Sequence, residues 1–88
     1  MPVLSTFFGI IVRMYQEKGG KHSLPHLHAE YGESEVVIAF DGTVIAGELP
    51  RSKMDLLIAW THIHREDLEA NWKLLSNGEQ FFRIDPLR

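Results

Sequence analysis

Two pairs of histidines, each with one residue between its members, are the side chains in this sequence most able to do chemistry. The first pair is His26 and His28, followed by Glu30. On a β-strand these three side chains project from one face, about 6.5–7 Å apart along the chain. Two imidazoles and a carboxylate at that spacing could bind a divalent metal ion or act as general acid and base. A purely structural interpretation stays open, because histidines on the solvent face of an amphipathic strand need neither role.

The second pair, His62 and His64, falls in a segment whose apolar residues recur every three or four positions, as in a helix. Residues two apart on a helix point about 200° apart, so these two side chains do not face each other. His64 lies on the apolar stripe and is the candidate to join His26 and His28 in a catalytic site. The alternative for His64 is a buried histidine satisfied by one hydrogen bond. His62 is expected at the surface.

The elements that must position these residues are strands first and a helix afterwards. Strand patterns cover residues 7–15, 26–31, 35–40 and 43–49, with turn signals at 32–33 and 41–42. Residues 16–25 are polar and rich in glycine, which predicts a loop. Helical periodicity begins after Pro50 and stops at Asn77-Gly78. It predicts one long helix, which is either continuous or bent near 64–66. The apolar tail at 81–84 is a candidate edge strand.

This order predicts an α+β fold in a single domain over residues 1–88, with an antiparallel meander of about four strands packed by one long C-terminal helix. Only one face of the sheet can take the helix. Leu27, Ala29 and Tyr31 alternate with the histidines, and their hydrophobicity predicts that they face the helix. His26 and His28 then face solvent as a shallow site or a dimer surface, which conflicts with a site shared with His64.

Composition narrows the classes of function. The chain has 88 residues, no cysteine and a formal net charge of −3, which predicts a cytoplasmic protein without disulfides and argues against nucleic-acid binding. We expect no signal peptide, and no apolar run approaches the roughly 20 residues of a membrane span, so no membrane partner is expected. Because the core of so short a chain is thin, oligomerisation often supplements it, which favours a homodimer.

Four motifs together resemble one family across nearly the whole chain. They are residues 2–10 (PVLSTFFGI), 25–28 (PHLH), 47–50 (GELP) and the helical stretch 60–72. The family consists of small bacterial proteins described as Domain of Unknown Function 4160, and Leu27 stands where an aromatic residue is usual. The resemblance implies no established activity, but the family's members look like one half of a toxin–antitoxin gene pair. The positions that match the family motifs are Pro25, His26, His28, Glu48, Trp60, His64, Asn71 and Trp72.

The sequence leaves two main classes of function open. The first is an interaction or assembly module, either a homodimer or the partner of a small co-encoded protein, which the thin core, the aromatic tail and the resemblance favour. The second is a small hydrolase of the ribonuclease-toxin type. Its catalytic candidates are His26, His28 and His64, and a divalent metal ion would be held by His26, His28 and Glu30. The acidic net charge counts against an RNA substrate, and metal binding without catalysis is a third alternative.

Overall fold

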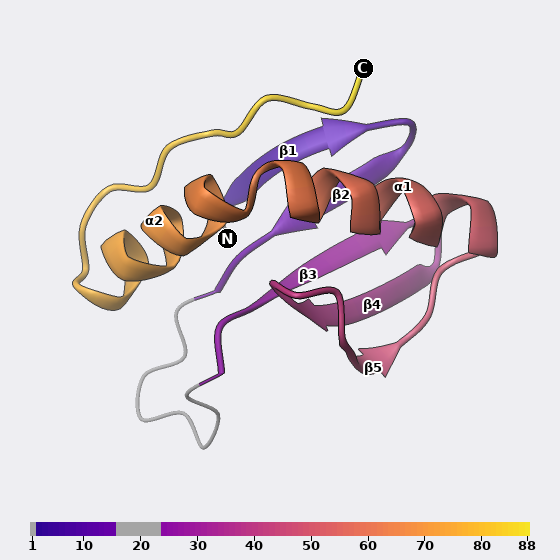
Figure 1. The fold of residues 1–88 in the computed structure, drawn as a ribbon, viewed down its shortest axis with the longest axis horizontal. Coiled ribbons are helices and arrows are strands. Elements are labelled where there is room, and N and C mark those ends of the chain that lie inside the picture. Colours follow the sequence, from indigo (N-terminus) through magenta and orange to yellow (C-terminus); the bar gives the residue numbers. More distant parts are fainter. Residues whose placement is uncertain (1, 16–23) are drawn as a thin grey trace.

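Five strands form one antiparallel sheet in which the spatial order follows the chain order. The computed structural model describes residues 2–15 and 24–88, and Figure 1 shows the strands side by side from β1 to β5. The strands are β1 (Val3–Phe7), β2 (Ile10–Arg13), β3 (His26–Tyr31), β4 (Ser34–Ala39) and β5 (Val44–Gly47). The α+β class and the meander are confirmed, with five strands where about four were expected. Residues 16–23 of the predicted 16–25 loop lie outside the described residues.

The N-terminal segment holds the additional strand. The sequence predicts one strand over 7–15, but β1 and β2 form a hairpin in which Phe7 lies opposite Ile10. The turn consists of Phe8 and Gly9, whose φ angles are 49° and 82°. A two-residue hairpin turn of this kind needs a positive φ at both positions, which glycine adopts readily and a bulky residue does not. The single-strand prediction is wrong because a continuous apolar run conceals the turn.

The C-terminal helical segment is two helices rather than one. α1 spans Arg51–Ile63 and α2 spans Arg65–Ser76. His64 lies between them with φ −105° and ψ 24°, although its amide still donates to the Trp60 carbonyl. Just before the break, the Thr61 hydroxyl donates to the Leu57 carbonyl at 2.8 Å, a contact that often bends helices. The expectation of one long helix, either continuous or bent near 64–66, is therefore corrected to two helices, and their junction falls where the sequence indicated a bend.

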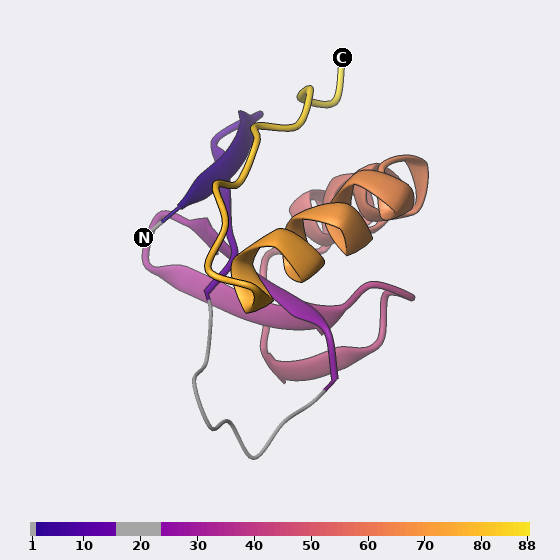
Figure 2. The ribbon, with the colours of Figure 1, turned by 90° about the vertical axis from the view of Figure 1, so that its left-hand side faces the viewer.

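The core lies between one face of the sheet and the two helices, which Figure 2 shows on the same side. Alternate side chains of the strands fill this layer. The fully buried hydrophobic core residues of β2 to β4 and of the helices are Ile10, Val12, Leu27, Ala29, Val36, Ile38, Leu57, Trp60 and Leu68. Leu27 and Ala29 therefore face the helices, as their hydrophobicity predicts. Since successive strand residues point to opposite faces, His28 and Glu30 point away from the helices.

The C-terminal tail, residues 79–88, has no regular secondary structure, so the expected edge strand at 81–84 is not formed. Side chains from both helices nevertheless fix it in place. The Asn71 side-chain amide makes two hydrogen bonds with the backbone of Phe82, at 2.9 and 3.0 Å. Trp60 Nε1 donates to the Asp85 carbonyl at 2.8 Å. Because Asn71 and Trp60 are fully buried, these bonds satisfy polar groups that would otherwise be costly in the core.

The same tail lies along β1, as Figure 2 shows. The amide of Ile84 donates to the carbonyl of Leu4 at 2.8 Å, and the Ile84 side chain is buried in the core. The tail therefore flanks one edge of the sheet, while β5 ends the sheet on the other side.

The formation of β5 depends on a glycine. Gly47 has a φ of 75°, and a Cβ atom at this position would overlap the carbonyl oxygen of Glu35 on β4. The same carbonyl accepts a hydrogen bond from the Glu48 amide at 3.0 Å. Gly47 thus combines a left-handed backbone with a close approach between two strands, and both exclude a side chain.

Gly47→Ala should therefore lower the free energy of unfolding more than Gly78→Ala, its matched control. Gly78 has a φ of 71°, but nothing lies within 4 Å of a Cβ atom built there. The control should lose about 1–2 kcal/mol for its backbone conformation alone, and Gly47→Ala about 1–3 kcal/mol more for the overlap. Urea unfolding followed by circular dichroism measures both variants. Equal losses would contradict the close approach of β5 to β4.

Candidate functional site

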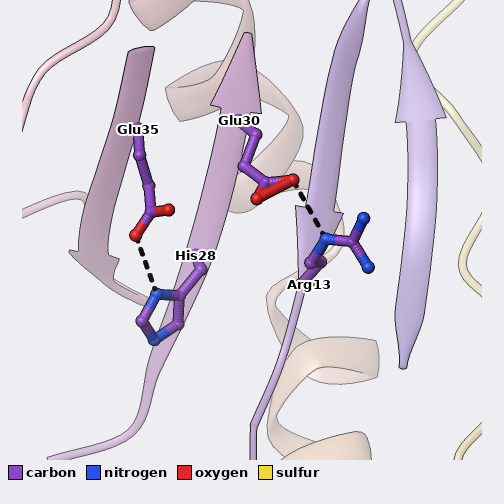
Figure 3. Close-up of polar contacts among 4 residues, drawn as sticks. All are labelled: Arg13, His28, Glu30 and Glu35. Atoms are coloured by element: carbon purple, nitrogen blue, oxygen red, sulfur yellow. Dashed lines mark hydrogen bonds and ion pairs between the residues drawn. The ribbon is translucent and has the colours of Figure 1, made fainter. Parts of the chain in front are cut away.

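His28, the second member of the first histidine pair, belongs to a group of polar side chains on the face of the sheet that the helices leave open. Figure 3 shows Arg13, His28, Glu30 and Glu35 on this face, with the helices behind the sheet. Arg13 lies opposite His28 in the register, and Glu30 lies opposite Glu35. Residues directly opposite each other in an antiparallel pair point to the same face. We call these four residues, together with Tyr15 and His26, the histidine face.

His28 lies at the centre of the histidine face. Its Nδ1 is 3.5 Å from Glu35 Oε1, and the Tyr15 ring packs edge-on against it with the ring centroids 4.3 Å apart. Its Nε2 is buried and has no hydrogen-bond partner among the described residues. When the proton is on Nδ1 and faces Glu35, the neutral imidazole keeps a lone pair on Nε2. A carboxylate that orients an imidazole in this way is a common feature of general-base sites.

His26 lies beside His28 but is held differently. The two ring centroids are 5.4 Å apart, so the structure brings the predicted strand pair together. His26 is only 5% exposed, and its Nδ1 lies 2.9 Å from the Leu24 carbonyl oxygen, to which it donates. The His26 ring also contacts Trp72 of α2, with centroids 5.2 Å apart. His26 therefore connects the start of β3 to the helical layer.

Glu30 pairs with Arg13 rather than with the imidazoles. Glu30 Oε1 is 3.0 Å from Arg13 Nε, and in Figure 3 its carboxylate points toward Arg13 while the His28 ring lies on the side of Glu35. Within residues 2–15 and 24–88, no group of three or more histidine, cysteine, aspartate or glutamate side chains is arranged to hold a metal ion. Of the three predicted metal ligands, the structure thus brings His26 and His28 together. The third, Glu30, is paired with the Arg13 guanidinium instead.

His64 lies in the helical layer, at the junction of α1 and α2. Its Nδ1 is 3.7 Å from Asp67 Oδ2, and its ring centroid is 5.4 Å from that of Trp60. Trp72, the α2 residue that contacts His26, lies eight residues further on, which is about 12 Å along a helix axis. The structure therefore places His64 with Trp60, and it does not gather His64 with His26 and His28 into one cluster.

Four residues around the strand histidines were not among the predicted site residues: Arg13, Tyr15, Glu35 and Trp72. The turn at 32–33 fixes the register of β3 against β4, so a register argument could have found Glu35. Arg13 ends β2 and Tyr15 lies just after it, so both are far from β3 in sequence, and no short turn sets the register of β2 against β3. Trp72 reaches the site from α2, and a helical stripe alone does not show which strand residue it meets.

Comparison with known proteins gives a family for the chain. The family model described as "Domain of unknown function (DUF4160)" matches residues 9–73. This segment contains the whole histidine face and β5, and it ends before the C-terminal tail. No curated protein and no solved structure matches the chain. In the part of the chain that the structure describes, neither helix is long and apolar enough to cross a membrane.

The Tyr15 hydroxyl reports on the electrostatics of the histidine face. Burial raises the pKa of Tyr15 above 10.0, the carboxylates of Glu30 and Glu35 raise it further, and the Arg13 guanidinium opposes them. The folded state therefore favours neutral tyrosine. The resulting contribution to stability is complete below the pKa of the unfolded chain, and it is lost as the pH rises through the higher pKa of the folded state.

A Tyr31→Phe variant, in which Tyr15 is the only remaining tyrosine, should therefore ionise above pH 10 in an absorbance titration. Adding Glu30→Gln should lower the midpoint, because it removes a negative charge and releases Arg13 from its ion pair. Glu33→Gln, in the exposed turn between β3 and β4, is the matched control and should leave the midpoint unchanged. If Glu30→Gln leaves the titration midpoint of Tyr15 unchanged, the packing of Tyr15 on this face is contradicted.

Proposed function

We propose that this chain, which belongs to the family described as domain of unknown function DUF4160, is a protein-interaction module that assembles through the open edge of its sheet. Its partner is a second copy of the chain or a small co-encoded protein, as in a toxin–antitoxin-like gene pair. One observation carries the proposal: among residues 2–15 and 24–88, the C-terminal tail flanks one edge of the sheet and the other edge, β5, is exposed.

The exposed edge is β5. This strand pairs with β4 on one side and stands last in the sheet, at its lower edge in Figure 1. All four of its residues are exposed, and the side chains include Val44 and Ile45, which are 52% and 46% exposed. At the opposite edge, the Ile84 amide ties the C-terminal tail to β1. A strand of exposed β-branched residues with unpaired backbone groups is a template for another strand.

The sequence around β5 does little to prevent such pairing. Proteins usually protect an edge strand with charged side chains, proline or a pronounced bulge. Residues 43–47 contain no charged residue and no proline. The pairing of β4 with β5 is irregular between Val37 and Ile38, where Ile45 is the extra residue on β5, so within residues 43–47 this bulge is the one protective feature of the edge. The absence of charge and proline still leaves exposed β-branched side chains to which a partner strand can add.

Ile45→Lys should disrupt assembly, because a charge on an edge strand opposes the addition of another strand. Ile63→Lys is the matched control, since Ile63 is 65% exposed at the end of α1 and outside the edge. Size-exclusion chromatography with light scattering should show a dimer, or a complex with the product of the neighbouring gene, for the wild type and for Ile63→Lys. Ile45→Lys should weaken the assembly at least about tenfold.

The outcome that refutes the proposal is also clear. A strict monomer at high micromolar concentration, with no complex when the neighbouring gene product is added, would leave the exposed edge without a function. Equal weakening by Ile45→Lys and Ile63→Lys would show that assembly responds to added charge in general and not to β5.

The geometry around His28 favours a second candidate function, a small histidine-dependent hydrolase of the ribonuclease-toxin type. The specific observation is that Glu35 lies beside His28 Nδ1 at 3.5 Å while Nε2 has no partner among the described side chains. His26, with its ring centroid 5.4 Å away, would be the second acid–base group or the second ligand of a divalent metal ion. The net charge of −3 opposes an RNA substrate, because RNA enzymes of this size rely on basic surface.

If the chain is such a toxin, its expression should slow the growth of the host. His28→Ala should restore growth, because it removes the oriented imidazole, and His26→Ala should restore it at least partly. His62→Ala is the matched control, since His62 is an exposed histidine, as predicted from the sequence, and should leave growth slow. Equal growth of all four strains would count against catalysis by the strand histidines.

A further inference from the structure

We infer that a groove between β5 and the first turns of α1 binds an extended segment of another protein in which basic and β-branched side chains alternate. The inference rests on the proposed function and identifies the partner by its chemistry. It combines the exposed strand, an open hollow beside it and the charges around that hollow.

The hollow opens next to the end of β5 and has a volume of about 680 Å³, which is within the usual range of ligand pockets. It lies where β5 leads into α1, so strand, junction and helix all contribute to its wall. The lining residues that matter for its chemistry are Val44, Gly47, Glu48, Arg51, Met54 and Asp55. Because Gly47 has no side chain, the wall is open at the point where the strand ends.

Strand alternation decides which partner side chains reach the hollow. Val36 and Ile38 point into the core, and they lie opposite Gly47 and Val44 of β5. These two β5 positions therefore belong to the helix side of the sheet. They are three residues apart because Ile45 is the extra residue of the bulge. On either side of this bulge, a strand that adds to β5 sends alternate side chains to the helix side, where the first turns of α1 form the far wall. Its other side chains lie on the open face.

The charges of the hollow favour a basic side chain of the partner strand on the helix side of the sheet. Two acidic residues, Glu48 and Asp55, and one basic residue, Arg51, line the hollow. Val44 and Met54 line the same hollow and supply apolar surface. A lysine or arginine fits both features, because its aliphatic stem can pack on the apolar surface while its charged end meets the carboxylates. A carboxylate of a partner at the same place would be repelled.

The open side of an added strand has a different requirement. Ala46 of β5 lies opposite Val37 of β4, which lies opposite His28 of β3, so these three residues share the open face. Next to Ala46 and Val37, a β-branched partner side chain would extend an apolar row across the strands. Basic residues on one side and β-branched residues on the other give the alternating pattern.

The same charges disfavour the β5 strand of a second copy as the occupant. The segment 41–48 (DGTVIAGE) carries two carboxylates and no basic residue. Pairing two such segments would add acidic side chains to a groove that already holds Glu48 and Asp55, and like charges that face each other across an interface are costly. The structure therefore favours a basic segment from a different protein.

The test is a titration of ¹⁵N-labelled full-length protein with synthetic peptides, followed by amide chemical shifts. The probes are the basic peptide Ac-KVKVKVK-NH2, its acidic counterpart Ac-EVEVEVE-NH2, and a basic peptide with a central proline, Ac-KVKPKVK-NH2. The basic peptide should shift the amides of residues 44–48 and of Met54. The acidic peptide should bind at least about tenfold more weakly, and the proline peptide should lose binding because it cannot complete the backbone ladder.

Charge variants make the test specific to the groove. Glu48→Gln with Asp55→Asn should weaken binding of the basic peptide about fivefold or more. Glu66→Gln with Glu79→Gln removes two negative charges from exposed positions on α2 and at the start of the C-terminal tail, and this matched control should bind as the wild type does. Equal weakening by both pairs, or equal binding of acidic and basic peptides, would overturn the inference.

One further result separates this inference from the proposed function. If none of the peptides shifts the β5 amides but light scattering still detects a dimer or a complex that Ile45→Lys disrupts, the groove inference is wrong while the interaction module stands. If neither peptide binding nor assembly is detected, both are wrong.

Discussion

The alternation of side chains along β3 is the constraint that positions the rest of this structure. Leu27 and Ala29 are fully buried against the helices, so the strand cannot slip by one residue without moving His28 and Glu30 into the core. A carboxylate buried there without a partner would cost several kcal/mol, of the order of 3–5. The two-residue period that builds the core therefore also presents an imidazole and a carboxylate on the open face. Packing of the core is therefore enough to explain why His28 and Glu30 lie on the histidine face, whether or not they take part in chemistry.

The helical layer uses its polar groups to close the fold. Asn71 is fully buried and satisfies both halves of its amide with the backbone of Phe82, and Trp60 Nε1 reaches the Asp85 carbonyl. Buried amides of this kind are stable only when every donor and acceptor is used. Asn71 and Trp60, which match the family motifs, therefore have structural roles here. They hold the tail along β1, and β5 is left as the exposed edge.

The sequence predicts best where a local signal marks the geometry. The turns at 32–33 and 41–42 contain glycines and separate alternating segments, so β3, β4 and β5 could be found with nearly correct bounds. At Asp41-Gly42 the structure shows the expected bonds, with the Gly42 amide donating to the Ala39 carbonyl and the Thr43 amide to Asp41 Oδ1. The first hairpin could not be found this way, because Phe8 occupies a left-handed position that phenylalanine rarely adopts.

The candidate site was predictable in part for the same reason. His26 and His28 share a strand, so their proximity follows from the period of that strand alone. Their partners come from other elements: Tyr15 from the segment after β2, Glu35 from β4 and Trp72 from α2. Such contacts depend on long-range pairing, which periodicity does not determine. His64 shows the reverse case, since its contact with Trp60 follows from their spacing of four along a helix, whereas the helical stripe could not show how His64 lies relative to the strand histidines.

The two proposed functional surfaces meet at Glu35 and use different atoms of it. The Glu35 carboxylate faces His28 on the open side of the sheet, while the Glu35 carbonyl accepts the Glu48 amide where β5 ends. A side-chain change at residue 35 therefore alters the surroundings of His28 and keeps the backbone bond that anchors β5. Conversely, a charge placed at Ile45 leaves the imidazoles and their carboxylate in position. Because the fold separates the two surfaces in this way, one substitution can disrupt assembly without changing the surroundings of His28, and another can do the reverse. Each candidate function can therefore be tested by substitutions on its own surface.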